Sequence, residues 1–250
     1  MEKLPYFEIA KSGYRVVYYN WQNMARLGLV PFVIIFVLAI LNAILSRAVM
    51  ASAAGGNPGA AAGLSFLILL LTLAWVASIV PFLVAWHRFT IDVADKRMPT
   101  SKVTVGKKEL LYFAYMIAYG IAIAIIYSIG IVLGGILLGF LFTLGMLYLA
   151  MRFAFIFPEI ALGRRTDPAK SWRQTAKDHV ELWLLGIALL IPMIVVAVVI
   201  NTIAAGTAAI PFLGIALAIV LQIVGMAIYI AFLASFTSAL TLAYKRIVID

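Results

Sequence analysis

Three charged residues lie at the edges of long apolar stretches, and they are the first candidates for chemistry. Arg152 lies inside an apolar stretch, Glu159 follows seven residues later, and Arg88 ends an earlier apolar stretch at a similar depth. A guanidinium in hydrocarbon is costly unless it meets an acid, an anionic ligand or the membrane interface. We therefore hold two hypotheses: these residues form a pocket for a phospholipid headgroup or other anion, or a buried ion pair joins the second and fourth spans.

A second basic group lies on an amphipathic helix that we predict for residues 166–183. Thr166 or Asp167 can cap its start, and Pro168 suits its first position, where a missing N–H does no harm. Its two faces have helical spacing, the basic one formed by Lys170, Arg173 and Lys177 and the apolar one by Ala169, Trp172, Ala176, Val180 and Trp183. Such a helix can bind lipid phosphate, and it can also serve as an anchor that fixes the topology.

The other polar residues do not form a pattern that is typical of catalysis or metal binding. The chain has two histidines, His87 and His179, in separate loops, and no cysteine. Asp92 and Asp95 lie in a polar loop, and no P-loop, HExxH or Gly-x-Ser-x-Gly motif occurs. We predict a protein without enzymatic activity, cofactor or metal. An enzyme of lipid metabolism that uses the loop carboxylates is a third alternative.

The elements that position these residues are membrane-spanning helices. Of 250 residues, 65% are hydrophobic and 12% charged, and the mean hydropathy is +1.11, a bias that bilayer hydrocarbon tolerates. The 42 residues from Leu110 to Met151 carry no charge. As one helix they would measure roughly 60 Å, twice the hydrocarbon thickness, so we predict a hairpin that turns at Gly130, Gly134, Gly135 and Gly139. The predicted fold is all-α, with six transmembrane helices in three hairpins at about 29–46, 64–86, 110–130, 136–157, 182–202 and 212–244.

Residues 1–27 precede the transmembrane domain of residues 28–250 and are predicted to form an amphipathic helix, not a signal peptide. The helix has a basic face and an aromatic face. Two placements are open, in the bilayer interface or packed on the transmembrane bundle. Tryptophans near span ends are typical interfacial anchors, and we assign this role to Trp21, Trp86, Trp172 and Trp183.

The basic residues are divided unevenly between the two sides of the predicted topology. Of the 19 Lys and Arg residues, 18 lie in residues 1–27, 88–109, 152–177 and 245–246, whereas the opposite side has only Arg47. The side richer in Lys and Arg is normally cytoplasmic. We therefore predict a multi-pass protein of a bacterial inner membrane, with both termini in the cytoplasm. Attraction to anionic headgroups explains the net charge of +9 without nucleic acid.

Three short motifs carry a family resemblance. They are Trp86-His87-Arg88 after the second span, Arg152-Phe153 with Phe157-Pro158-Glu159-Ile160-Ala161-Leu162, and Ser171-Trp172-Arg173-Gln174-Thr175. In this order they resemble the membrane domain attached to some bacterial glycerophosphoryl diester phosphodiesterases, and the related stand-alone six-span inner-membrane proteins (YciC-like proteins). The resemblance covers about residues 20–245 and implies a fold and a compartment. Glu159 and Lys177-Asp178-His179 depart from the family pattern, and phosphodiesterase activity is not expected because these residues include no such catalytic domain.

These features favour a non-catalytic, lipid-interacting structural or accessory subunit of a membrane assembly. The expected partners are anionic lipid headgroups on the cytoplasmic side, and either a membrane-protein partner or a second copy of the chain. The alternative is a transporter or channel for a lipid or small amphiphile. A path through the bundle would then be lined by Asn201 or Gln222, which we otherwise expect to make hydrogen bonds between helices.

Overall fold

The chain consists of helices and their connections in all the residues that the structure describes. This computed structural model describes residues 4–99, 101–207 and 213–250. No strand occurs in these ranges, which confirms the predicted all-α class. The elements are α1 (Tyr6–Tyr19), α2 (Trp21–Ala54), α3 (Pro58–Ala94), α4 (Lys107–Phe153), α5 (Ile156–Ala161), α6 (Pro168–Gln174), α7 (His179–Thr207), α8 (Leu213–Tyr244) and a terminal π-helical turn, η1 (Lys245–Ile249).

Six helical stretches are long and apolar enough to cross a membrane, and the protein is a polytopic membrane protein. Four of the six are longer than the predicted spans. The first two leave only residues 55–57 between them, whereas the predicted spans at about 29–46 and 64–86 left residues 47–63 for the connection. The predicted connection was too long because alanine, which is frequent there, is the best helix former. In addition, the Asn57 side chain caps α3 by accepting the Ala60 amide at 3.1 Å, with Pro58 at the first position.

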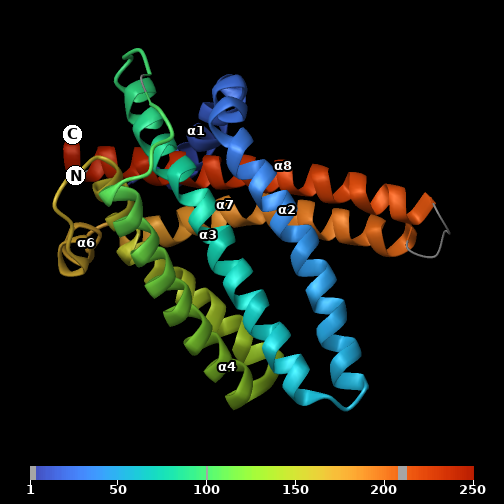
Figure 1. The fold of residues 1–250 in the computed structure, drawn as a ribbon. Coiled ribbons are helices and arrows are strands. Elements are labelled where there is room, and N and C mark those ends of the chain that lie inside the picture. The colour runs from blue at the N-terminus through green and yellow to red at the C-terminus, as the bar shows by residue number, and fades with distance from the viewer. Residues whose placement is uncertain (1–3, 100, 208–212) are drawn as a thin grey trace.

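The uncharged stretch from Leu110 to Met151, which lies within α4, is a hairpin, as its length predicted. The Tyr119 hydroxyl donates to the Leu149 carbonyl at 3.3 Å although the two are 30 residues apart, a separation that in a straight helix would be about 45 Å. The two legs, Lys107–Gly130 and Leu141–Ala161, each qualify as a span and lie side by side in Figure 1. A Cβ atom on Gly130 would be 2.8 Å from Cγ of Phe142. Gly130 therefore permits the close approach of the legs.

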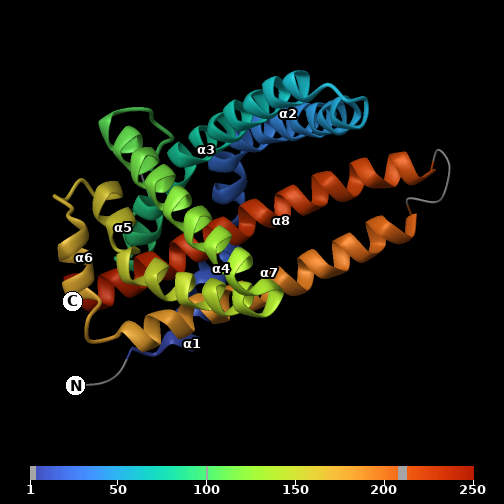
Figure 2. The ribbon, with the colours of Figure 1, turned by 90° about the horizontal axis from the view of Figure 1, so that it is seen from below.

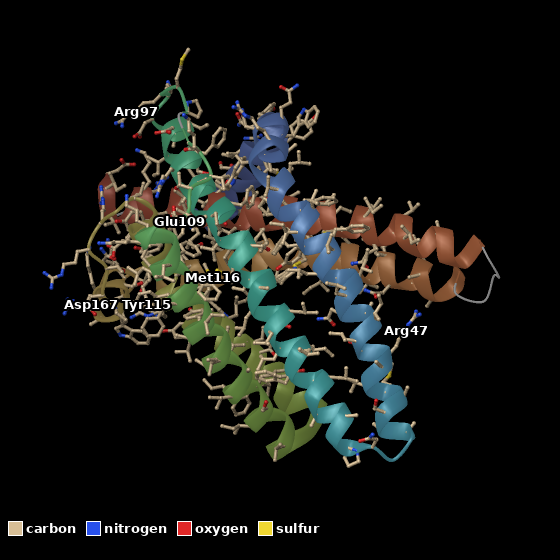
Figure 3. The ribbon with its side chains drawn as sticks, in the orientation of Figure 1. Arg47, Arg97, Glu109, Tyr115, Met116 and Asp167 are labelled. Atoms are coloured by element: carbon tan, nitrogen blue, oxygen red, sulfur yellow. The ribbon has the colours of Figure 1, made fainter. Side chains whose placement is uncertain are left out.

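The three hairpins meet at one end of the molecule and diverge towards the other. Figures 1 and 2 show α2 with α3, the two legs of α4, and α7 with α8 leaving a common base in different directions. We call this base the charged end. It holds both termini, the connection between α3 and α4, and the short helices α5 and α6 (Figure 1). Figure 3 shows Arg47 far from the charged end, on the outer part of α2.

The buried core is concentrated at the charged end. One cluster includes Phe82, Trp86 and Phe89 of α3, and a second joins Leu185 of α7 to Tyr244 of α8. Towards the outer tips, by contrast, large apolar side chains are exposed along α2, α7 and α8. Lipid can cover these outer surfaces because bilayer hydrocarbon is as apolar as they are. The side chains that must hold the hairpins together are therefore those near the charged end.

The N-terminal helix α1 packs across α8. Ile9, Ala10, Gly13 and Val17 form its buried face, and a Cβ atom on Gly13 would be 2.7 Å from both the Ala239 Cβ atom and the Ser235 carbonyl oxygen. The Tyr14 hydroxyl donates to the Leu189 carbonyl of α7 at 2.8 Å, and partial burial raises the pKa of Tyr14. Of the two predicted placements, the structure shows packing on the bundle. The aromatic side chains Phe7, Tyr18 and Tyr19 remain exposed on α1.

We predict that Gly13→Val weakens the protein by displacing α1 from α8. Added methyl groups at a tight contact cost about 1–3 kcal/mol, and here the nearest atoms include backbone, which cannot move aside. Gly120→Val is the matched control, because a Cβ atom on Gly120 has no atom within 4 Å. Thermal unfolding in detergent measures both variants. Equal unfolding temperatures for Gly13→Val, Gly120→Val and the wild type would contradict the packing of α1 described above.

Candidate functional site at the charged end

A buried hydrogen-bond network joins α3, α4 and α8. The Trp86 indole N–H donates to the Ala234 carbonyl at 2.9 Å and to the Ser238 hydroxyl at 2.8 Å. One residue further, His87 Nδ1 is 2.6 Å from the Thr241 hydroxyl and His87 Nε2 is 3.2 Å from the Tyr112 hydroxyl. Both side chains of α3 are fully buried. The network connects the first, second and third hairpins at one level.

The network assigns the tautomer of His87. The Thr241 hydroxyl donates its one proton to the Thr237 carbonyl at 2.6 Å, so it must accept from His87 Nδ1–H. His87 Nε2 then carries no proton and accepts from the Tyr112 hydroxyl. Both ring nitrogens are thus used, and no group of three metal-ligating side chains occurs among the described residues. His87 is therefore a structural residue with a fixed neutral form.

Glu159 is fully buried and connects three short segments. Its carboxylate is 2.6 Å from Lys170 Nζ and accepts from the Gln174 side-chain amide at 3.1 Å, both on α6. The Tyr244 hydroxyl of α8 donates to the same oxygen at 3.4 Å and accepts from Arg164 at 3.2 Å. A buried carboxylate requires such partners because its desolvation is costly. Glu159 therefore attaches α6 and the end of α8 to α5.

Arg152 is also buried, and its contacts are with α6. One terminal nitrogen donates to the Trp172 carbonyl at 2.8 Å, and the guanidinium carbon lies 4.0 Å from the centre of the Trp172 ring. The Arg152 carbonyl accepts hydrogen bonds from the Ser171 and Thr175 hydroxyls, each at 3.1 Å. The aromatic face offsets part of the cost of burying the cation. Arg152 and Glu159 thus each bind α6, and no ion pair between them occurs among the described residues.

Arg88 makes contacts of its own. Its Nε donates to the Ala161 carbonyl at the end of α5 at 2.8 Å. Its terminal nitrogen is 3.5 Å from the Glu109 carboxylate, which also accepts from the Thr104 hydroxyl at 3.1 Å. The hypothesis of one pocket formed by Arg88, Arg152 and Glu159 was therefore wrong, because each makes its own contacts. Arg88 joins the second span to α5 through a carbonyl, and its acidic partner, Glu109, lies at the start of the third span.

The predicted amphipathic helix over residues 166–183 is divided in the structure. Asp167 caps α6 by accepting the Ala169 amide at 3.0 Å, α6 ends at Gln174, and residues after His179 belong to α7. The single-helix prediction was wrong because Thr175, at the break, turns its hydroxyl back to the Arg152 and Ser171 carbonyls. Of the basic candidates, Lys170 is used by Glu159, whereas Arg173 and Lys177 are exposed.

The four tryptophans assigned as interfacial anchors differ in their exposure. Trp21 is 60% exposed and Trp172 is 39% exposed, which leaves both available to an interface. Trp183 is half-buried and donates to the Leu144 carbonyl of α4 at 3.1 Å. Trp86 is fully buried in the network described above. The prediction for Trp86 was wrong because its position at a span end does not reveal that α8 covers it.

A cleft with four basic side chains lies between the ends of α3, α4 and α5. Its volume is about 510 Å³, and its basic lining residues are Arg88, Arg97, Lys102 and Lys108, with Asp92 as the acidic one. Lys108 extends towards Gly163, where a Cβ atom would be 2.5 Å from the Lys108 ammonium and where the backbone φ of +72° also favours glycine. Figure 3 shows Arg97 and Glu109 at this end of the molecule. We call this space the basic cleft.

Of the four basic residues of the basic cleft, only Arg88 was a candidate binding residue from the sequence. The others were counted as charges of the 88–109 segment, which has six Lys and Arg residues. The high density of Lys and Arg in this segment was the signal for a basic site that the sequence offered. It did not identify the cleft because two of its walls, Ala161 and Leu162, come from a segment more than fifty residues later in the chain.

Comparison with known proteins does not identify a relative. No family model matches the chain, and no curated protein or solved structure matches it at the required significance. The resemblance to the YciC-like proteins thus stays a prediction.

We predict that Tyr112→Phe destabilises the protein although it removes one atom. The change leaves the buried His87 Nε2 without its donor, and an unsatisfied buried polar atom costs about 1–3 kcal/mol. Tyr115→Phe is the control, since the Tyr115 hydroxyl has no hydrogen bond among the described residues. Thermal unfolding compares the two. If Tyr112→Phe were as stable as Tyr115→Phe, the assigned proton arrangement would be wrong.

We predict that Lys170→Met releases α6. The buried Glu159 loses its cation, which we expect to cost about 1–2 kcal/mol because Lys170 is partly exposed. Local opening and therefore tryptic cleavage at Arg164 or Arg165 should rise roughly five- to thirtyfold. Arg173→Met, on the same helix, removes a cation that has no ion pair with any described residue and should leave the rate unchanged. Equal cleavage of both variants would show that the Lys170–Glu159 pair does not hold α6.

Proposed function

We propose that the protein is a non-catalytic membrane protein that binds anionic lipid headgroups in the basic cleft and acts as a structural or accessory subunit. The observation that carries this proposal is the convergence of Arg88, Arg97, Lys102 and Lys108 on one cleft. Glu109 balances part of the Arg88 charge, Asp95 pairs with Arg97 at 3.3 Å, and Asp92 adds a third acid against the four cations. A net positive charge remains, which an anionic ligand would neutralise.

The surroundings of the basic cleft support a lipid over a soluble anion. Leu111 lies one helical turn after Lys108 on α4 and is 45% exposed. An exposed apolar side chain one turn from a cation is an arrangement that an interfacial lipid can contact, with its headgroup on the cation and a chain on the apolar side chain. The cleft volume of about 510 Å³ also lies within the range of small-molecule sites.

The proposed location is a bacterial inner membrane with the charged end in the cytoplasm. This rests on the distribution of charge, since 18 of 19 Lys and Arg residues belong to the segments of the charged end. The cytoplasmic leaflet carries anionic lipid and attracts such a surface by about 1 kcal/mol per Lys or Arg near it. The orientation and the ligand are therefore consistent with each other.

A transporter is less well supported. Asn201, one of the residues expected to line a path, donates to the Ala197 carbonyl of its own helix at 2.7 Å. Gln222 is exposed on α8. Neither residue belongs to the lining of the basic cleft or of four other cavities in the described part of the chain. We therefore favour the accessory role, in which lipid and a protein partner contact the outside of the bundle.

We predict that Lys102→Glu with Lys108→Glu abolishes preferential retention of phosphatidylglycerol over phosphatidylcholine. Two charge reversals at one cleft should cost more than about 2 kcal/mol of headgroup attraction, or more than tenfold in retention. The matched control is Arg173→Glu with Lys177→Glu on the other basic segment. Native mass spectrometry of protein purified in mild detergent counts the retained lipids. Equal loss in both double variants would indicate diffuse attraction by the whole charged end and would refute a specific site.

The same purification tests the accessory role. A membrane-protein partner or a second copy should remain bound in mild detergent and appear as a defined complex mass. A lone monomer that retains no lipid, from membranes containing phosphatidylglycerol, would contradict the proposal.

A further inference from the structure

Two apolar cavities lie along the two legs of α4. One cavity of about 390 Å³ is lined by both legs, by Ile156 of α5 and by Pro168 of α6. A second cavity of about 380 Å³ lies further out. The two adjoin each other, since both are lined by Ile126, Met146 and Leu149, and we call them together the α4 groove.

The length of the α4 groove matches one leaflet of a bilayer. On the second leg its lining runs from Phe153 to Leu141, and twelve residues of helix measure about 18 Å. One leaflet contributes about 15 Å of hydrocarbon. The groove follows the helix axis from the charged end outwards. A single extended acyl chain has this shape, whereas a compact ligand does not.

The lining of the groove suits an acyl chain in its chemistry as well. It has no charged residue, and it includes small residues on both legs, Ala118, Ala122, Gly145 and Ala150. Its polar lining side chains are two tyrosines. The Tyr119 hydroxyl is used by the Leu149 and Ala150 carbonyls, and Tyr115 lies at the end of the groove nearest the basic cleft. Within a bilayer such a groove selects among lipids by how well an acyl chain fits into it, since lipid tails are as apolar as the side chains that line it.

One face of α4 connects the groove to the basic cleft. Lys108, Leu111, Tyr115, Ala118 and Ala122 follow one another at intervals of three and four residues and therefore lie along one side of the helix. Lys108 lines the basic cleft, and Tyr115, Ala118 and Ala122 line the groove. Leu111, between them, is 45% exposed. Lys108 and Tyr115 are about 10 Å apart along the axis, a distance that a lipid headgroup and glycerol can cover.

We infer that one phospholipid occupies this face, with its phosphate at Lys108 in the basic cleft, its glycerol over Leu111 and one acyl chain in the α4 groove. This inference rests on the proposed function and makes it more specific. It identifies the ligand as a long-chain phospholipid of the leaflet at the charged end. Headgroup charge gives the attraction, and the groove selects for chain length.

The test is to fill the groove without disturbing the helices. Gly145 lines the groove, and a Cβ atom there has no atom within 4 Å, so Gly145→Trp adds a side chain in the space meant for the acyl chain. Gly120→Trp is the matched control, because Gly120 is equally open but does not line the groove. Native mass spectrometry measures binding of dioleoyl and dihexanoyl phosphatidylglycerol. We expect wild type and Gly120→Trp to prefer the long-chain lipid by at least tenfold, and Gly145→Trp to lose that preference.

The possible results separate the groove from the headgroup site. If Lys108→Glu abolishes binding of both lipids but Gly145→Trp keeps the long-chain preference, the groove inference fails and the proposed function stands. If neither variant changes binding, both fail. Should Gly145→Trp not fold, a phosphatidylglycerol with a diazirine on its acyl chain serves on the wild type. Cross-links to the peptide containing Met146 and Leu149 would support the groove, whereas cross-links confined to α2 and α3 would overturn it.

Discussion

The close approach of other helices to one side of α8 is the constraint on which the rest of the structure depends. Ser235, Ser238 and Thr241 recur at every third residue, with Ala234 just before them and Ala239 between Ser238 and Thr241. This side receives Gly13 of α1, the Trp86 indole and the His87 ring. Small side chains allow backbones to approach, and their hydroxyls supply hydrogen bonds where water is excluded. Larger residues here would separate the first hairpin from the third.

The charged end carries the tertiary structure, and the outer halves of the hairpins contribute little to it. The hydrogen bonds between hairpins involve groups such as Trp86, Arg88 and Trp183, all near that end. Beyond them the helices diverge (Figures 1 and 2) and expose large apolar side chains. Lipid is thus part of the environment that defines the arrangement. A protein whose outer surfaces depend on lipid in this way can respond to the kinds of lipid around it. Both binding proposals assign a site to one such lipid.

Much of the architecture could be predicted from the sequence, because span number and hairpin order follow from apolar length and charge position. The α4 hairpin is the clearest case, since 42 uncharged residues exceed what one span can use. The sequence also indicated that Arg152 and Glu159 need partners. It could not indicate which ones, because Arg152 binds a carbonyl and a ring on α6, and Glu159 binds Lys170. Such contacts depend on how a seven-residue helix is placed, which hydrophobic periodicity does not specify.

The order of donors in the network around His87 fixes the position of the first hairpin relative to the third. Each proton points the same way, from Tyr112 through His87 to Thr241 and on to Thr237. Trp86, the neighbouring residue, is bonded to α8 one helical turn away. If α3 slid along α8 by even one residue, both side chains would lose their acceptors together. Trp86 and His87 together therefore fix the register of α3 against α8. They allow one axial position and one rotation of the third hairpin relative to the first.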